Sequence, residues 1–127
     1  MFRSVVLGSN DIEQSKRFYD AVMGVLGCPP AEPNWRGALA YRNKGAGLMI
    51  SKPINGQPAS PANGGTIALD LDSVEQVRAW HDAGVANGGT SAEDPPGERT
   101  YPTSKVFSAY LRDPDGNKLC AIYQLPA

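Results

Sequence analysis

An internal repeat is the feature of this sequence that most constrains its fold. The tripeptide Ile-Glu-Gln at 12–14 is matched by Val-Glu-Gln at 74–76, and Asp-Ala at 20–21 is matched by Asp-Ala at 82–83. Both matches keep the same order and spacing. A repeat of this kind predicts two copies of one supersecondary unit, because a single copy is too small to bury its own hydrophobic face.

Each copy contains the same expected elements in the same order. Helices are predicted over 12–25 and 74–85, where apolar residues recur at helical spacing. Asp11 stands directly before the first helix, in a position to cap it. A short apolar strand is predicted before each helix, over 4–8 and 66–71.

The second copy ends in a predicted hairpin. The sequence Asp-Pro-Asp-Gly-Asn at 113–117 is typical of a type I turn followed by a left-handed glycine. Tyr110 is therefore expected to face Cys120 across the two strands. Asp113 and Asp115 are explained by backbone hydrogen bonding within the turn rather than by catalysis.

A similar hairpin is predicted in the first copy, over 37–52. Its turn is expected at 43–45, which pairs Leu39 with Met49. The following run, 53–65, is rich in proline, glycine, asparagine and serine and is typical of a linker.

The chain is therefore interpreted as one domain over 1–127, with modules at about 1–57 and 64–127. Two βαβββ units predict an α+β fold, in which a curved, cup-shaped mixed sheet carries the helices on its convex face.

Composition excludes several classes of partner. A net charge of −1 provides no basic surface for nucleic acid or anionic lipid. No apolar run is long enough to span a membrane, and the apolar stretch at the start is too short for a signal peptide, so a cytoplasmic location is expected. Cys28 and Cys120 lack metal-ligand spacing and are expected to be reduced thiols.

Two motifs carry a resemblance to a known family. They are Ser-Asn-Asp-Ile-Glu-Gln-Ser-Lys-Arg-Phe-Tyr-Asp at 9–20 and Tyr-Leu-Arg-Asp-Pro-Asp-Gly-Asn at 110–117. Together with the repeat, they resemble the vicinal oxygen chelate superfamily over about 2–123. That superfamily includes glyoxalase I, extradiol dioxygenases, and fosfomycin and bleomycin resistance proteins.

The resemblance implies four positions for metal ligands, which in this sequence are Ser4, Met49, Ile67 and Cys120. Serine and isoleucine do not hold a divalent ion, methionine suits soft metals, and Cys120 has no partner ligand. The single histidine, His81, falls in the second predicted helix and is expected on its solvent flank. Neither a metal nor another cofactor is therefore expected.

Strand alternation and the resemblance together give a candidate pocket lining. Ser4, Tyr41 and Tyr110 would orient polar groups of a ligand, and Arg99 and Tyr101 lie in a predicted loop over 89–105 that reaches the mouth of the cup in related proteins. The alternative is that these side chains pack on one another and fill the cup. The full candidate set is Ser4, Trp35, Tyr41, Met49, Ile67, Leu69, Arg99, Tyr101, Tyr110 and Cys120.

The sequence thus favours a metal-independent protein that binds a small organic molecule, as a homodimer, with the ligand unidentified. The alternative is a glyoxalase-type lyase or dioxygenase-like enzyme acting on a small oxygenated substrate, or a metal-free isomerase using Tyr110 or Cys120. Such acid–base work needs a group tuned toward neutral pH, and Cys120 is better interpreted as a small buried hydrophobe. A third interpretation is a structural subunit with a filled cup.

Overall fold

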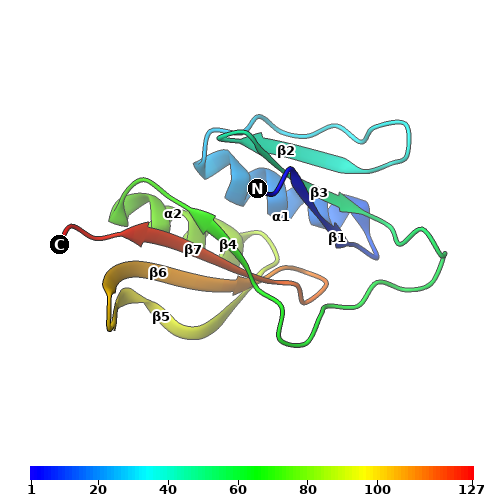
Figure 1. Ribbon diagram of the computed structural model, residues 1–127. Helices are drawn as coiled ribbons and strands as arrows, with labels where there is room; N and C mark the ends of the chain where they lie inside the picture. The colour runs from blue at the N-terminus through cyan, green and yellow to red at the C-terminus, as the bar shows by residue number, and fades with distance from the viewer.

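The computed structural model describes all residues, 1–127, and confirms the α+β class (Figure 1). Two helices lie behind two sheets that stand side by side. The elements in chain order are β1 (Ser4–Gly8), α1 (Ile12–Val25), β2 (Leu39–Asn43), β3 (Ala46–Ser51), β4 (Ile67–Asp70), α2 (Val74–Ala86), β5 (Thr90–Tyr101), β6 (Ser104–Arg112) and β7 (Lys118–Gln124).

The two modules form separate open sheets. The first has the order β1-β3-β2 and the second the order β4-β7-β6-β5, so the first module has one strand fewer. The connection from α1 to β2 contains Pro29, Pro30 and Pro33, which have no N–H to donate to a strand ladder. In both sheets the module's first strand pairs in parallel with its last strand and has no strand partner on its other side.

Both helices begin where the sequence predicts. The Asp11 carboxylate accepts a hydrogen bond from the Gln14 amide at 3.2 Å, and the Ser73 hydroxyl accepts one from the Gln76 amide at 3.0 Å. These caps satisfy amides that the first helical turn leaves without partners. Neither helix combines the length and the apolar character that crossing a membrane requires.

The first hairpin differs from the prediction by one residue. Its turn is the pair Lys44-Gly45, with φ of 51° and 82°, which matches a two-residue type I′ turn. Leu39 therefore pairs with Ile50, and the predicted pairing of Leu39 with Met49 is wrong. Because side chains alternate along a strand, this slip moves Leu39 and Tyr41 to the opposite face of the sheet. In the second module the predicted pairing of Tyr110 with Cys120 is confirmed.

The segment predicted as an irregular loop over 89–105 is mostly an edge strand, β5. Its pairing with β6 shifts between Ala92 and Gly97, so the strand contains a bulge. Pro95 and Pro96 lie inside the bulge, and the strand is largely exposed along its length. These features remove the apolar alternation by which sequence reasoning finds a strand.

The core lies between the helices and the sheets, where α1 and α2 pack against each other. Phe18, Tyr19 and Trp80 are fully buried there. The packing requires two glycines: a Cβ on Gly84 would lie 2.3 Å from a Leu111 methyl group, and one on Gly89 would lie 2.4 Å from the Phe18 ring. The remaining core members are mainly apolar residues of α1, α2 and the strands.

A buried carboxylate joins the two modules. Asp113 is 4% exposed and accepts hydrogen bonds from the Tyr19 hydroxyl at 2.5 Å, from the amides of Asp115 and Asn117, and from the Asn117 side chain at 2.8 Å. The same Asn117 side chain donates to the Gly8 carbonyl at 3.1 Å. The β6–β7 turn is therefore fastened to both α1 and β1 of the other module.

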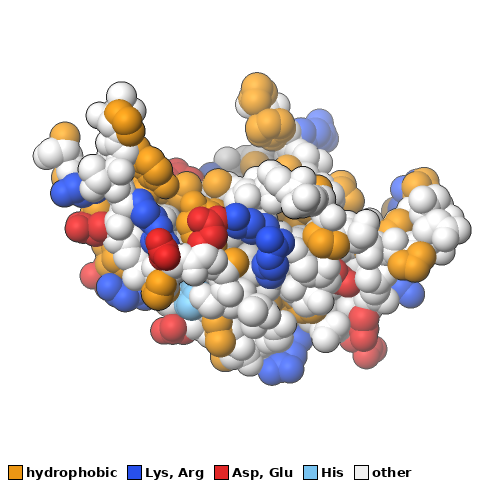
Figure 2. Space-filling view, turned by 90° about the horizontal axis from the view of Figure 1, so that it is seen from below, with side chains coloured by type: hydrophobic (Ala, Val, Ile, Leu, Met, Phe, Trp, Pro, Cys, Tyr) orange, Lys and Arg blue, Asp and Glu red, His pale blue; other side chains and the backbone are white.

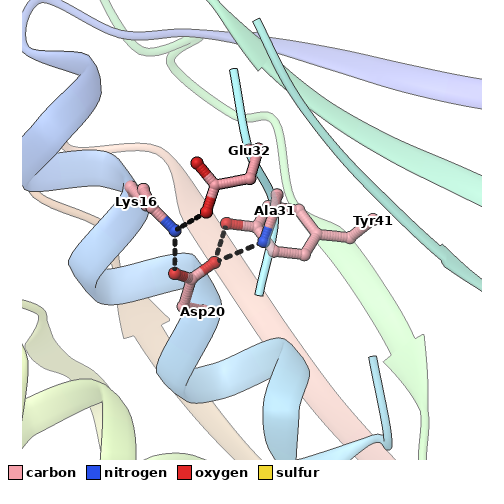
Figure 3. Close-up of polar contacts among 5 residues, drawn as sticks. All are labelled: Lys16, Asp20, Ala31, Glu32 and Tyr41. Atoms are coloured by element: carbon pink, nitrogen blue, oxygen red, sulfur yellow. Dashed lines mark hydrogen bonds and ion pairs between the residues drawn. The ribbon is translucent and has the colours of Figure 1, made fainter. Parts of the chain in front are cut away.

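A second network fastens the connection between α1 and β2 to the helix (Figure 3). The Asp20 carboxylate accepts hydrogen bonds from Lys16 at 2.6 Å, from the Ala31 amide at 3.0 Å and from the Tyr41 hydroxyl at 2.8 Å. Lys16 also lies 3.8 Å from a carboxylate oxygen of Glu32. Burial alone would raise the pKa of Asp20, but these hydrogen bonds outweigh it and lower the pKa below its usual value.

We expect Asp113→Asn to lower the free energy of unfolding by about 3 kcal/mol, because the amide cannot accept all the hydrogen bonds that converge on the buried carboxylate. Chemical denaturation measures this change. Asp82→Asn is the matched control: Asp82 is exposed on α2, and its substitution should change stability by about 0.5 kcal/mol or less. Equal unfolding midpoints for the two variants would contradict the role given to Asp113.

We expect Asp20→Asn to lower the free energy of unfolding by about 1–2 kcal/mol at neutral pH. A carboxyl group with a lowered pKa in the folded state stabilises the fold above its unfolded pKa, and this contribution is lost as the pH falls through the folded value. The difference between wild type and variant should therefore shrink below about pH 4. Denaturation across pH measures it, with Glu32→Gln, on a side chain 85% exposed, as the control that should follow the wild type. A difference that persists in acid would contradict this account.

Candidate functional site

The predicted pocket residues are divided between the two faces of the sheets. One face packs against the helices and contributes to the core; it is called the helix face, and the opposite one the open face. Tyr41, Ile67 and Leu69 belong to or pack against the core cluster and therefore lie on the helix face. Met49 and Cys120 alternate with core residues along β3 and β7 and lie on the open face. The ten candidates therefore do not converge on one site.

The four positions that the resemblance implies for metal ligands do not form a donor set. Ser4 is exposed on β1, and Met49 is half-buried on β3. Cys120 pairs with Ala68 of β4, whereas Ile67 points to the helix face. Ile67 is therefore not the residue of β4 that shares the open face with Cys120. No group of three or more His, Cys, Asp or Glu side chains in the chain is arranged to hold a metal ion. These residues do not fit the hard divalent ion of the family's metalloenzymes.

Tyr110, Cys120 and Arg99 are brought together on the open face of the second sheet. The Tyr110 ring lies 5.5 Å from the Arg99 guanidinium and 5.2 Å from the Lys118 ammonium group, and it neighbours Cys120 across the strands. Burial raises the pKa of the Cys120 thiol, and burial followed by hydrogen bonding with Cys120 raises the pKa of Tyr110. Both groups stay protonated near neutral pH, so neither supplies a general base there.

The two cations beside Tyr110 already have partners. Arg99 donates to the backbone carbonyls of Gly97 and Ser108 and to those of Asp94 and Pro95 in the bulge. Lys118 forms an ion pair with Glu93. Arg99 therefore holds the bulge of β5 in place, and no observation supports its predicted contact with a ligand.

Three other residues singled out from the sequence lie outside the linings of the two cavities described below. Trp35 is 86% exposed and stacks against the Arg36 guanidinium at 4.7 Å, and Tyr101 is exposed at the end of β5. His81 is half-buried on α2, where its Nε2 lies 2.9 Å from the Ser91 hydroxyl, and burial lowers its pKa. The solvent flank predicted for His81 is consistent with this position, and His81 belongs to no group of three or more His, Cys, Asp or Glu side chains that could hold a metal ion.

The main cavity is a cleft between the two modules, with a volume of about 630 Å³. It lies between β1 and β3 of the first sheet, β4 of the second, and the end of α1. The outer edges of β1 and β4 have no strand partner here, so no strand ladder joins the two sheets at this cavity. This cavity is called the cleft below. Its lining residues are Phe2, Val5, Met23, Leu26, Tyr41, Asn43, Lys44, Ala46, Gly47, Leu48, Thr66, Ile67, Ala68, Leu69 and Asp70.

The candidate set contains three of the cleft residues, Tyr41, Ile67 and Leu69. Val5 and Leu48 were missed because the open face was taken as the ligand side, although the alternation of β1 places Val5 opposite Ser4. A smaller cavity of about 210 Å³ lies between the end of β1 and the start of β4.

Most polar side chains of the cleft already have partners. The Tyr41 hydroxyl donates to Asp20, and burial, followed by that hydrogen bond, raises its pKa. The Asn43 amide donates to the Leu26 carbonyl at 3.3 Å. Lys44 donates to Asp72 at 2.6 Å. The arrangement offers an apolar volume with a polar end.

Comparison with known proteins agrees with the fold. The family model of the glyoxalase/bleomycin resistance protein/dioxygenase superfamily matches residues 2–121. The crystal structure of a glyoxalase/bleomycin resistance protein from Albidiferax ferrireducens T118 is 50% identical, with a TM-score of 0.92 over 97% of this chain and 98% of that one.

More distant structures share the fold alone. A glyoxalase-related enzyme from Fulvimarina pelagi is 22% identical, with a TM-score of 0.72 over 97% of this chain and 87% of that one. Lactoylglutathione lyase from Agrobacterium tumefaciens is 20% identical, with a TM-score of 0.65 over 97% and 92%. With the internal repeat, the two sheets and the family match in agreement, the chain belongs to the glyoxalase/bleomycin resistance protein/dioxygenase superfamily.

Proposed function

We propose that this chain binds a small organic molecule in the cleft and does so without a metal ion. The observation that carries the proposal is the cleft itself. Its volume of about 630 Å³ and its mainly apolar lining are typical of pockets for small ligands, in which a few polar groups fix the orientation. The absence of a fitting donor set among the chain's side chains supports binding that depends on the apolar walls rather than on a metal.

A lyase or dioxygenase-like activity is less well supported than binding. The family's metal chemistry needs a set of hard ligands, which the positions of Ser4, Met49 and Cys120 do not provide. Metal-free acid–base chemistry needs a group that titrates near neutral pH, whereas the pKa values of Tyr41, Tyr110 and Cys120 are raised by burial.

Two methionines allow the site of binding to be observed directly. Met23 lines the cleft, whereas Met49 lies on the open face. We expect 1-naphthylmethanol, a neutral apolar probe, to shift the NMR signal of the labelled Met23 methyl group and to leave that of Met49 unchanged. Ile67→Trp, at a half-buried lining position on the helix face, should weaken binding about tenfold or more by filling the cleft with a larger side chain. Calorimetric titration measures the affinity.

The matched control is Ala40→Trp, which adds the same side chain to an exposed strand position outside the cleft lining and should leave binding unchanged. Binding should also survive treatment with a chelator. A shift at Met49 instead of Met23 would move the site to the open face. Stoichiometric nickel, zinc, iron or manganese in the untagged protein, with a metal-dependent rise in Tm, would contradict metal independence.

We also propose that the chain forms a homodimer. Large hydrophobic side chains are exposed at Met1, Phe2, Val6, Trp35, Ile54 and Tyr101, and hydrophobic groups project from the surface seen in Figure 2. Phe2 and Val6 lie beside and on β1, whose outer edge has no strand partner, and an exposed apolar strand edge favours association with another chain. A cytoplasmic location stays a prediction.

Light scattering with size-exclusion chromatography is expected to give twice the mass of one chain. Val6 is exposed on the open face of the edge strand β1. Val6→Asp is expected to shift the population toward monomer, because a charge buried without a partner in an interface is costly. Trp35→Asp makes the same kind of change at a loop and tests whether that region belongs to the interface. A monomeric wild type at micromolar concentration would contradict the proposal.

A further inference from the structure

The charged groups of the cleft are gathered at one end. Lys44 and Asp70 belong to the lining, and Asp72 reaches Lys44 from beside it. All other lining side chains are apolar or uncharged. The charge that a ligand meets is therefore decided by how these three groups are paired.

Lys44 is committed to Asp72. Its ammonium group lies 2.6 Å from a carboxylate oxygen of Asp72, and the pKa of Lys44 is raised first by that hydrogen bond and also by the charges of Asp72 and Asp70. The backbone of Lys44 is fixed by the type I′ turn, where its φ is 51°. Lys44 thus offsets the charge of Asp72 and leaves that of Asp70 without a bonded counter-ion at this end.

Asp70 is the carboxylate without a partner. Its side chain makes no hydrogen bond and no ion pair with any residue of the chain, and it is exposed at the end of β4. The Asn43 side chain uses its N–H₂ group on the Leu26 carbonyl, which leaves its oxygen free to accept. The polar end of the cleft therefore offers acceptors and negative charge to a ligand.

From this accounting we infer that the cleft selects ligands in which an apolar body carries a positively charged amine, with the amine beside Asp70. The inference rests on the proposed function and names its ligand class. An amine can donate a hydrogen bond to Asp70 and balance its charge. A carboxylate in the same place would face Asp70 at close range and would have to displace Asp72 from Lys44.

Three probes with the same naphthyl body test the inference: 1-naphthylmethylamine, 1-naphthylmethanol and 1-naphthoate. Calorimetric titration at neutral pH and low salt is expected to give the tightest binding for the amine, by about fivefold over the alcohol, and the weakest for the carboxylate. Higher ionic strength should reduce the preference for the amine, because salt screens a partly exposed ion pair.

Asp70→Asn should lower the affinity for the amine about fivefold, to near that for the alcohol, and should change the affinity for the alcohol much less. Asp82→Asn, which makes the same change of charge on α2 outside the cleft lining, should keep the preference of the wild type. The Met23 methyl signal reports in each case that the probe occupies the cleft.

The outcomes separate the inference from the proposal on which it rests. Equal affinities for the three probes at Met23, a preference for the carboxylate, or an amine preference that survives Asp70→Asn would overturn the inference and leave the cleft as the binding site. No shift of Met23 with any probe would overturn the proposed function, and the inference with it.

Discussion

The rest of the structure depends on the buried Asp113 carboxylate, because it is the point where one module is seated on the other. The β6–β7 turn brings Asp113 and Asn117 against Tyr19 of α1 and Gly8 at the end of β1. A carboxylate buried in this way is tolerable only when its oxygens are saturated with donors. The β6–β7 turn can therefore keep its conformation only while it stays seated on the first module. This contact fixes the position of one sheet relative to the other at the end of β1.

The opposite ends of the modules are joined by a weaker version of the same contact. There the β2–β3 turn of the first module meets the start of α2: Lys44 pairs with Asp72 in solvent, and Gln76 links the Asp72 amide to the Val25 carbonyl. Exposed ion pairs contribute little to stability. The sheets are thus held firmly at one end and loosely at the other. The cleft lies beside the loose end, where Asn43 and Lys44 of the β2–β3 turn belong to its lining.

Local signals in the sequence were enough for the fold and not for the site. The caps at Asp11 and Ser73 and the turn at Asp113 are chosen by short-range chemistry, so the helices and the second hairpin were predicted correctly. The first hairpin depended on whether Lys44 could adopt a positive φ, which propensity alone disfavours. The conformation of Lys44 sets the register of the hairpin and therefore the face of the sheet on which Tyr41 lies. The gap between β1 and β4 results from tertiary packing, for which one sequence carries no periodic signal.

Membership of the superfamily is compatible with side chains at Met49 and Cys120 that do not suit a hard metal ion, because a strand has two independent faces. The helix face holds the core residues that specify the fold, such as Leu48, Leu111 and Leu119, and these tolerate little change. Met49 and Cys120 lie on the open face, outside that cluster, so their identity is less tightly tied to the packing of the helices on the sheets. A family match therefore constrains the backbone more strongly than the chemistry. The function of this chain has to be argued from its cleft, where Asp70 and the apolar walls remain free to meet a ligand.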